Sequence, residues 1–108
     1  MESLPDDISG DSFMPIKALN TFTRDWVIKA RVANKTMKPT QKGGHLLKIE
    51  LVDAYGTCIE GTFFNDCAKQ YEPQLEKNMI YCFSGGAVRM ANKRWTNVNN
   101  DFCLTFDK

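Results

Sequence analysis

Apolar residues that recur at every second position constrain this chain more than any other feature of the sequence. In residues 26–32 the even-numbered positions are all apolar, and the odd-numbered ones include Lys29 and Arg31. This is the period-two pattern of a half-buried β-strand. Further strand-like segments follow at 47–51, 57–64, 79–83, 87–90, 94–98 and 102–106. The segments 87–90 and 94–98 are predicted to pair as a hairpin.

Helical spacing is limited to one short stretch after residue 64. The pair Asn65-Asp66 offers an N-cap, and apolar residues follow at positions 68, 71 and 75, but Pro73 limits a regular helix to about two turns. No helix is long enough for a parallel crossover. Three strands, one short helix and further strands in residues 14–108 predict an all-β fold, a five-stranded Greek-key OB-fold barrel with the helix between strands 3 and 4. Other small barrels are the competing class.

Charge divides the chain near residue 13. Residues 1–13 hold four acidic side chains and no basic one, with no sustained period, and are predicted to be a flexible acidic leader or linker. Residues 14–108, the predicted domain, hold 14 basic and nine acidic side chains, a net charge of +5. That excess is compatible with a polyanionic partner. No apolar run approaches the roughly 18 residues of a membrane span, and no secretory signal opens the chain, so no membrane association is expected.

Motifs for metal binding and catalysis are missing from the sequence. The four cysteines, Cys58, Cys67, Cys82 and Cys103, form no C-x-x-C pair, and His45 is the single histidine, beside two glycines that indicate a hinge. The cysteines lie in apolar surroundings, as reduced thiols do in cytosolic or nuclear proteins. No Walker or Gly-x-Ser-x-Gly motif occurs. We therefore expect no enzyme, no metal and no cofactor.

Two aromatic residues stand beside polar or basic groups. Phe64 ends the third predicted strand before Asn65-Asp66, and Trp95 follows Lys93-Arg94. A single-stranded nucleic acid is held by rings that stack on bases and by cations that follow phosphates. Because successive strand residues face opposite sides, only one of Phe63 and Phe64 faces the interior. Spacing alone leaves open whether Phe64 is the exposed one.

Basic residues cluster at two places along the chain. Lys35, Lys38 and Lys42 lie in the polar segment 34–44, which is predicted to be a mobile loop because it contains Pro39 and a Gly-Gly pair. Arg89, Lys93 and Arg94 surround the predicted late hairpin. These clusters are interpreted as two basic edges of a groove that carries the rings. The alternative is an ordinary solvated surface.

An ordered set of motifs extends over nearly all of residues 14–108. They are MPIKAL at 14–19, WVIKARVANK at 26–35, ELVD at 50–53, TFFN at 62–65, YCFS at 81–84, ANK at 91–93, NDF at 100–102 and LTF at 104–106. Together they resemble the large subunit of replication protein A, in particular its first high-affinity single-strand-binding OB domain.

The resemblance implies a role for individual residues. Phe64 and Trp95 would stack on bases, Arg89 would contact a phosphate, Asn65 would hydrogen-bond nucleic acid, and the loop 35–42 would close over the strand. It implies single-stranded DNA binding in replication, repair and recombination in the nucleus. Other replication protein A-like subunits would bind through regions outside this chain, and residues 1–13 would correspond to an interdomain linker.

Two positions depart from the family pattern. Glu60 stands where a basic DNA contact is expected, and Cys103 where an acidic one is expected. The 34–44 segment is also shorter than the family's loop and lacks its aromatic residue and arginines, which leaves Lys38 and Lys42 as its cations. One alternative is therefore a paralogue that binds telomeric G-rich strands and associates with telomerase components. Another is an OB-fold protein-interaction module, with Phe64 and Trp95 as interface anchors.

Overall fold

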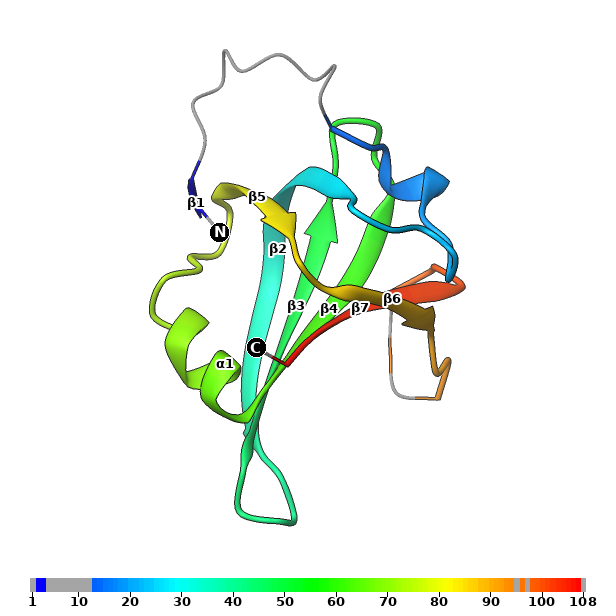
Figure 1. Cartoon of the computed structure of the whole chain (residues 1–108). Coiled ribbons are helices and arrows are strands. Elements are labelled where there is room, and N and C mark those ends of the chain that lie inside the picture. The colour runs from blue at the N-terminus through cyan, green and yellow to red at the C-terminus, as the bar shows by residue number, and fades with distance from the viewer. Residues whose placement is uncertain (1, 4–12, 95, 97, 108) are drawn as a thin grey trace.

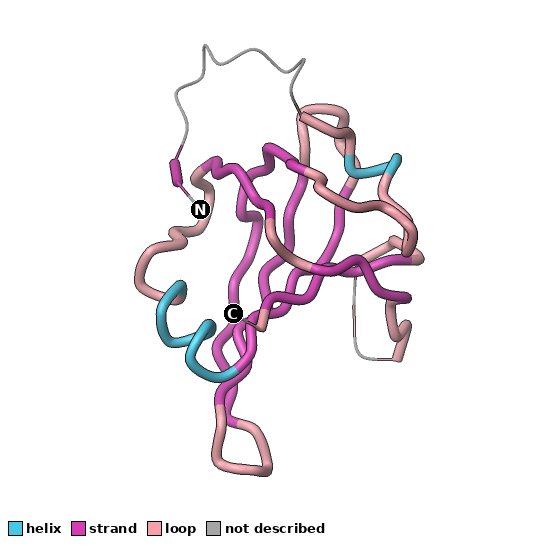
Figure 2. Tube along the Cα trace, viewed as in Figure 1, coloured by secondary structure: helices cyan, strands magenta, loops and turns pink. Residues whose placement is uncertain are grey.

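The computed structural model describes residues 2–3, 13–94, 96 and 98–107 of the 108-residue chain. Its elements are β1 (Glu2–Ser3), the 3₁₀ turn η2 (Ile16–Ala18), β2 (Val27–Pro39), β3 (His45–Val52), β4 (Cys58–Phe64), α1 (Asn65–Tyr71), β5 (Ile80–Ser84), β6 (Ala87–Met90) and β7 (Phe102–Phe106). Figures 1 and 2 show the strands curling around one interior, with the tip of the β2–β3 hairpin projecting beyond it. No helix within the described ranges is long and apolar enough to cross a membrane.

The sheet closes on itself through its fourth barrel strand, which is split in two. The strand order is β1-β5-β2-β3-β4-β7-β6, with β4 and β7 parallel and the other neighbours antiparallel. Only Gly85 and Gly86 separate β5 from β6, so one continuous segment pairs with β2 at one end and with β7 at the other. The predicted five-stranded Greek-key barrel, with its helix between strands 3 and 4, is confirmed.

The bend between β5 and β6 depends on its two glycines. Gly85 has a φ of +79°, a backbone conformation that residues with a side chain rarely adopt. A Cβ on Gly86 would lie 2.6 Å from Cε1 of Phe106 and 2.8 Å from the carbonyl oxygen of Thr105. The barrel closes here because the chain can bend at Gly85 and approach β7 closely at Gly86.

The barrel interior is filled by the alternating apolar residues that the sequence pattern indicates. The side chains of Leu47, Ile49, Phe63 and Phe83 have no exposed surface, and the rings of Phe63 and Phe106 stack with centroids 4.5 Å apart. The same holds for residues 26–32, whose even-numbered members are all buried. The helix α1 packs against this core through the buried Cys67 and Ala68.

The segment 34–44 differs from its prediction. Residues 34–39 continue β2, which pairs with β3 as far as Pro39 and His45, so the prediction of a loop was wrong for these residues. Pro39 is tolerated because it occupies the last pair of the ladder, where the strand ends. The turn itself is residues 40–44, where Gly43 has a φ of +81°.

Two further local predictions were wrong. Of the segment 94–98, the structure describes residues 94, 96 and 98, and none of them lies in a strand; β6 pairs with β7 instead, and Ala91 N–H donates to the carbonyl of Asp101. That register buries Val88 opposite Leu104. Asn65 is not an N-cap either: it is the first residue of α1, has a φ of +52°, and Phe64 occupies the cap position without a side-chain hydrogen bond.

Candidate nucleic-acid interface

The outward side of the barrel is accessible between two loops. Its floor is formed by the side chains of β3, β4, β7 and β6 that alternate with the core side chains, and we call it the outer face. The outer face consists of Leu46, Lys48, Glu50, Glu60, Thr62, Phe64, Arg89, Cys103 and Thr105, of which Thr62 is covered by its neighbours and buried. The turn 40–44 borders one end, at Phe64. Described residues between β6 and β7 border the other, where Thr96 and Asn100 contact β4.

Phe64 lies on the outer face, at the end of β4. Its neighbour Phe63 has no exposed surface, whereas Phe64 is half-buried and pairs with Leu46 of β3. Phe64 and Asn65 line a shallow pocket together with the turn 40–44, which includes Lys42. An aromatic residue, a lysine and an amide residue therefore line the same pocket at this end.

Asn65 links the helix to that turn. Its side-chain Oδ1 accepts a 3.4 Å hydrogen bond from the backbone N–H of His45, and a Cβ on Gly44 would overlap the same oxygen. The turn is closed by hydrogen bonds from Gly44 N–H to Thr40 Oγ1 and from Thr40 N–H to the Gly44 carbonyl. These contacts hold Lys42 beside Phe64, and the sequence gives no signal for them.

The side chains of the three lysines in segment 34–44 do not all point to the same side of the sheet. Lys38 and Lys42 are exposed, and Lys38 points to the side of Leu46 because the two are paired on adjacent strands. Lys35 has the opposite parity: its Nζ donates to the Glu72 carbonyl at 2.7 Å and lies 3.7 Å from the Glu72 carboxylate. Strand alternation thus directs Lys35 to the end of α1 and away from the outer face.

The opposite end of the outer face is bordered by basic residues of β6 and the β6–β7 loop. Arg89 is exposed and pairs with Cys103, and Arg94 is exposed in the loop. Lys93 is exposed as well and lies 3.4 Å from the carboxylate of Asp101. Trp95, the second predicted stacking residue, lies outside the described residues.

Glu60 occupies the middle of the outer face. It pairs with Glu50 on β3 and with Cys103 on β7, and its Oε2 accepts a 3.0 Å hydrogen bond from Thr96 Oγ1. A second hydrogen bond, 2.7 Å from Asn100 Nδ2 to the Cys58 carbonyl, also ties the β6–β7 loop to β4. Sequence reasoning singled out Glu60 but not its contact with the loop, because the two residues are 36 positions apart.

The carboxylate of Glu60 also affects its neighbour. Burial raises the pKa of the Cys103 thiol above its ordinary value, Glu60 raises it further, and Arg89 opposes both. The centre of the outer face carries two carboxylates, Glu50 and Glu60, next to one cation, Lys48, and its ends carry mainly basic charges. In the part of the chain that the structure describes, no three metal-ligating side chains come together.

A closed five-stranded barrel whose strand face lies between two loops defines an OB-fold domain, a class that binds oligonucleotides or oligosaccharides on this face. Comparisons with known proteins specify the class further. The chain is 43% identical over 100 residues to the replication factor A 51 kDa subunit of Crithidia fasciculata, covering 87% of this chain and 21% of that protein. It is 38% identical over 103 residues to the replication protein A 70 kDa DNA-binding subunit of Xenopus tropicalis, covering 92% and 17%.

Solved structures give the same assignment. A chain of a replication protein A heterotrimer bound to single-stranded DNA matches with a TM-score of 0.76 at 33% identity, covering 87% of this chain and 22% of that one. DNA-binding domain A of Saccharomyces cerevisiae replication protein A matches with a TM-score of 0.67 at 27% identity, covering 89% and 87%. The OB domain of Ta0387 from Thermoplasma acidophilum, at 10% identity and a TM-score of 0.59, supports the fold alone.

The chain is thus homologous to the DNA-binding large subunit of replication protein A, and the resemblance predicted from the sequence is confirmed. It spans 16–21% of the length of the curated relatives that it matches. No protein-family model matches the chain.

Proposed function

We propose that this chain binds single-stranded DNA on its outer face, as a domain of a replication protein A-like complex. The observation that carries the proposal is the arrangement at the end of β4, where Phe64 lines a pocket together with Asn65 and Lys42. The homologous chain bound to single-stranded DNA supports the choice of ligand.

The proposed mechanism assigns separate tasks to rings and cations. A base stacks on Phe64, and a second base stacks on Trp95, as the sequence predicts. Lys38 and Lys42 follow the phosphates at one end, while Arg89, Lys93 and Arg94 follow them at the other. Because rings accept any base and cations accept any phosphate, binding of this kind tolerates many sequences.

The acidic centre adds a second property to the proposed site. A backbone phosphate close to Glu60 would be repelled, whereas a carboxylate accepts hydrogen bonds from the exocyclic amines of bases. We infer that the strand lies with its bases, not its phosphates, toward Glu60. Bases with an exocyclic amine are then favoured over thymine at that position.

We also propose wider roles on the basis of the homology. The chain takes part in DNA replication, repair and recombination in the nucleus, associates with further replication protein A-like subunits and catalyses no reaction. The comparisons do not support telomerase components as partners, and the telomeric alternative stays a prediction. So does the division into a leader at 1–13 and a binding domain at 14–108.

A titration tests the proposal directly. The chain is mixed with equal lengths of fluorescent mixed-sequence single-stranded DNA, telomeric G-rich DNA, duplex DNA and RNA, at two salt concentrations. Because Lys93 is already paired with Asp101, four phosphate contacts are counted, from Lys38, Lys42, Arg89 and Arg94. The slope of log K against log salt for single strands is then expected to be about −3.

The outcomes distinguish the proposed function from the telomeric and protein-interaction alternatives. Salt-sensitive binding to both DNA single strands, and weaker binding to duplex, supports the proposal. A clear telomeric preference replaces it with the G-rich alternative, and no binding to any of them leaves the protein-interaction module.

A further inference from the structure

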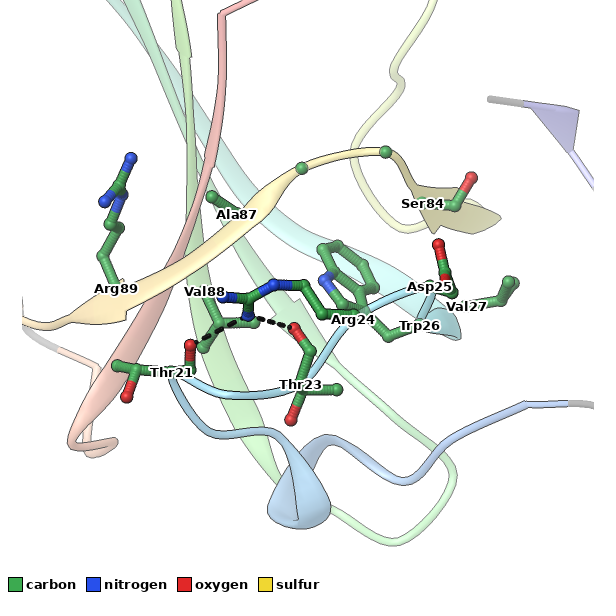
Figure 3. Close-up of a pocket in the computed structure, with 12 residues that line it drawn as sticks. Thr21, Thr23, Arg24, Asp25, Trp26, Val27, Ser84, Ala87, Val88 and Arg89 are labelled. Atoms are coloured by element: carbon green, nitrogen blue, oxygen red, sulfur yellow. Dashed lines mark hydrogen bonds between the residues drawn. The ribbon is translucent and has the colours of Figure 1, made fainter.

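A hollow lies at the bend between β5 and β6, adjacent to the outer face. Its walls are residues 21 and 23–27, which lead into β2, and residues 84–89 of the bend and β6. Figure 3 shows Arg24 extending from the first wall toward Val88, and Arg89 rising from the next position of β6. The hollow therefore has an arginine from each wall.

Arg24 is held in place by the backbone around it. Its Nη1 donates to the carbonyl of Thr21 at 3.0 Å and to that of Thr23 at 3.1 Å. A guanidinium has five N–H donors, so the groups on Nε and Nη2 remain for a ligand. An arginine fixed in this way loses little side-chain freedom when it binds an anion.

The charge of Arg24 is not neutralised by a neighbouring carboxylate. Of the two ion pairs among the described residues, neither involves Arg24 or Arg89. Asp25 also lines the hollow, but its carboxylate points toward Ser84, away from the Arg24 guanidinium (Figure 3). The hydroxyls of Thr21, Thr23 and Ser84 make the remaining walls polar.

An exposed aromatic residue, Phe22, lies in the turn that forms the first wall, between the lining residues Thr21 and Thr23. Phe22 is 86% exposed, although the turn that carries it is well ordered by hydrogen bonds. Asn20 Oδ1 accepts from Phe22 N–H, and Thr23 Oγ1 accepts from Asn20 N–H, both at 2.9 Å. A ring held out in solvent beside a cation is the combination that binds a single strand.

Arg89 connects this hollow to the outer face, because it pairs with Cys103 on the outer face and also lines the hollow. We propose that a single strand bound on the outer face continues past Arg89 into the hollow, where Arg24 binds a backbone phosphate and Phe22 offers a stacking surface to a base. This inference rests on the proposed function. It gives the domain a longer footprint than the outer face alone provides.

Because the proposed path lengthens the footprint on DNA, the test measures how affinity depends on the length of the strand. Strands of about 8 and about 20 nucleotides are titrated, since OB folds occupy about 4–16 nucleotides each. Arg24→Gln is expected to weaken binding of the long strand about three- to tenfold, to lower its salt slope by about 0.7, and to leave the short strand unaffected. Phe22→Ala is expected to act in the same length-dependent way.

Matched controls come from another part of the surface. Arg31 and Tyr55 are exposed and line a different pocket, so Arg31→Gln and Tyr55→Ala remove the same kinds of group outside the proposed path. Both are expected to leave long-strand affinity unchanged. All four positions are exposed, and thermal melting verifies the fold of each variant.

Failure of this inference is distinguishable from failure of the proposed function. If the unmodified chain binds both lengths with salt sensitivity and Arg24→Gln changes neither, or changes both equally, the extended path is wrong and the outer-face site stands. If the unmodified chain binds neither length, the proposed function fails, and the extended path fails with it.

Discussion

Two neighbouring phenylalanines of β4 face opposite sides of the barrel wall and have opposite surroundings. Phe63 has no exposed surface and packs against Phe106 and Tyr71, while Phe64 is half-buried beside a basic turn. The same strand thus contributes one ring to stability and one to a proposed binding surface. The comparison teaches that strand alternation allows the outer face to vary without disturbing the core.

The largest expected effect is on the inner side. Phe63→Ala removes a fully buried ring and leaves a cavity between Phe106 and Tyr71, which is expected to cost about 3–5 kcal/mol of unfolding free energy. Chemical denaturation followed by tryptophan fluorescence measures it. A loss as small as that of a surface substitution would show that the two sides of β4 are not energetically distinct.

The bend that closes the barrel is expected to be the next most sensitive position. Gly86→Ala places a Cβ within 3 Å of the Phe106 ring and the Thr105 carbonyl, so β7 or the bend must shift. Overpacking of this kind costs about 1–3 kcal/mol. Thermal melting compares it with Gly56→Ala, at a turn glycine with no atom within 4 Å of the added Cβ but with a φ of +83°. Gly86 has no positive φ, so its loss reports on the contact with β7, whereas the loss at Gly56 reports on backbone strain. No measurable loss in Gly86→Ala would contradict the tight approach of the bend to β7.

A smaller effect is expected on the outer side from Glu60→Gln. The amide keeps an acceptor for Thr96 but removes a negative charge from the centre of the outer face. Affinity for single-stranded DNA is expected to rise about two- to fivefold at low salt and less at high salt, because screening weakens the repulsion. The preference for bases with an exocyclic amine is also expected to decrease.

Glu76→Gln is the matched control for that charge change, since Glu76 is exposed in the segment between α1 and β5. Fluorescence titration with homopolymers of cytosine and thymine measures both quantities. Unchanged affinity and base preference in Glu60→Gln would contradict the proposed orientation of the strand.

The smallest expected effect concerns the thiol beside Glu60. A raised pKa means that Cys103 is less ionised at a given pH, and only the thiolate reacts with alkylating agents. Iodoacetamide is therefore expected to modify Cys103 more slowly than the exposed Cys58 near pH 8. The rate at Cys103 should increase in Glu60→Gln. An unchanged rate of Cys103 alkylation in Glu60→Gln would show that the Glu60 carboxylate does not influence the thiol.

Much of the fold was predictable because it depends on local patterns. The alternation in 26–32 and in 57–64 corresponds to real strands, and the parity that groups Phe64 with Thr62 and Glu60 matches the outer face. Pro39 misled the prediction because a proline rule for central strands does not apply to the last pair of a hairpin.

The parts of the site that were not predictable depend on contacts between distant segments. Nothing local indicates that Lys35 is bound by Glu72, that Asn65 contacts the 40–44 turn, or that Thr96 donates to Glu60. The hollow with Arg24 is also a tertiary feature, since its two walls are about 60 residues apart in the chain. The role of Phe64 needed the family resemblance, because spacing left its exposure open.

The most direct test of the central claim compares binding and stability for a single outer ring. Phe64→Leu keeps an apolar side chain at the edge of the pocket and removes the stacking surface, which is worth about 1–3 kcal/mol per base, or about 5- to 150-fold in affinity. Tyr55→Ala, which removes an exposed ring elsewhere, is the control. The account predicts a loss of single-strand affinity in this range for Phe64→Leu alone, with a melting temperature near that of the unmodified chain. Equal affinity of Phe64→Leu and the unmodified chain would contradict it.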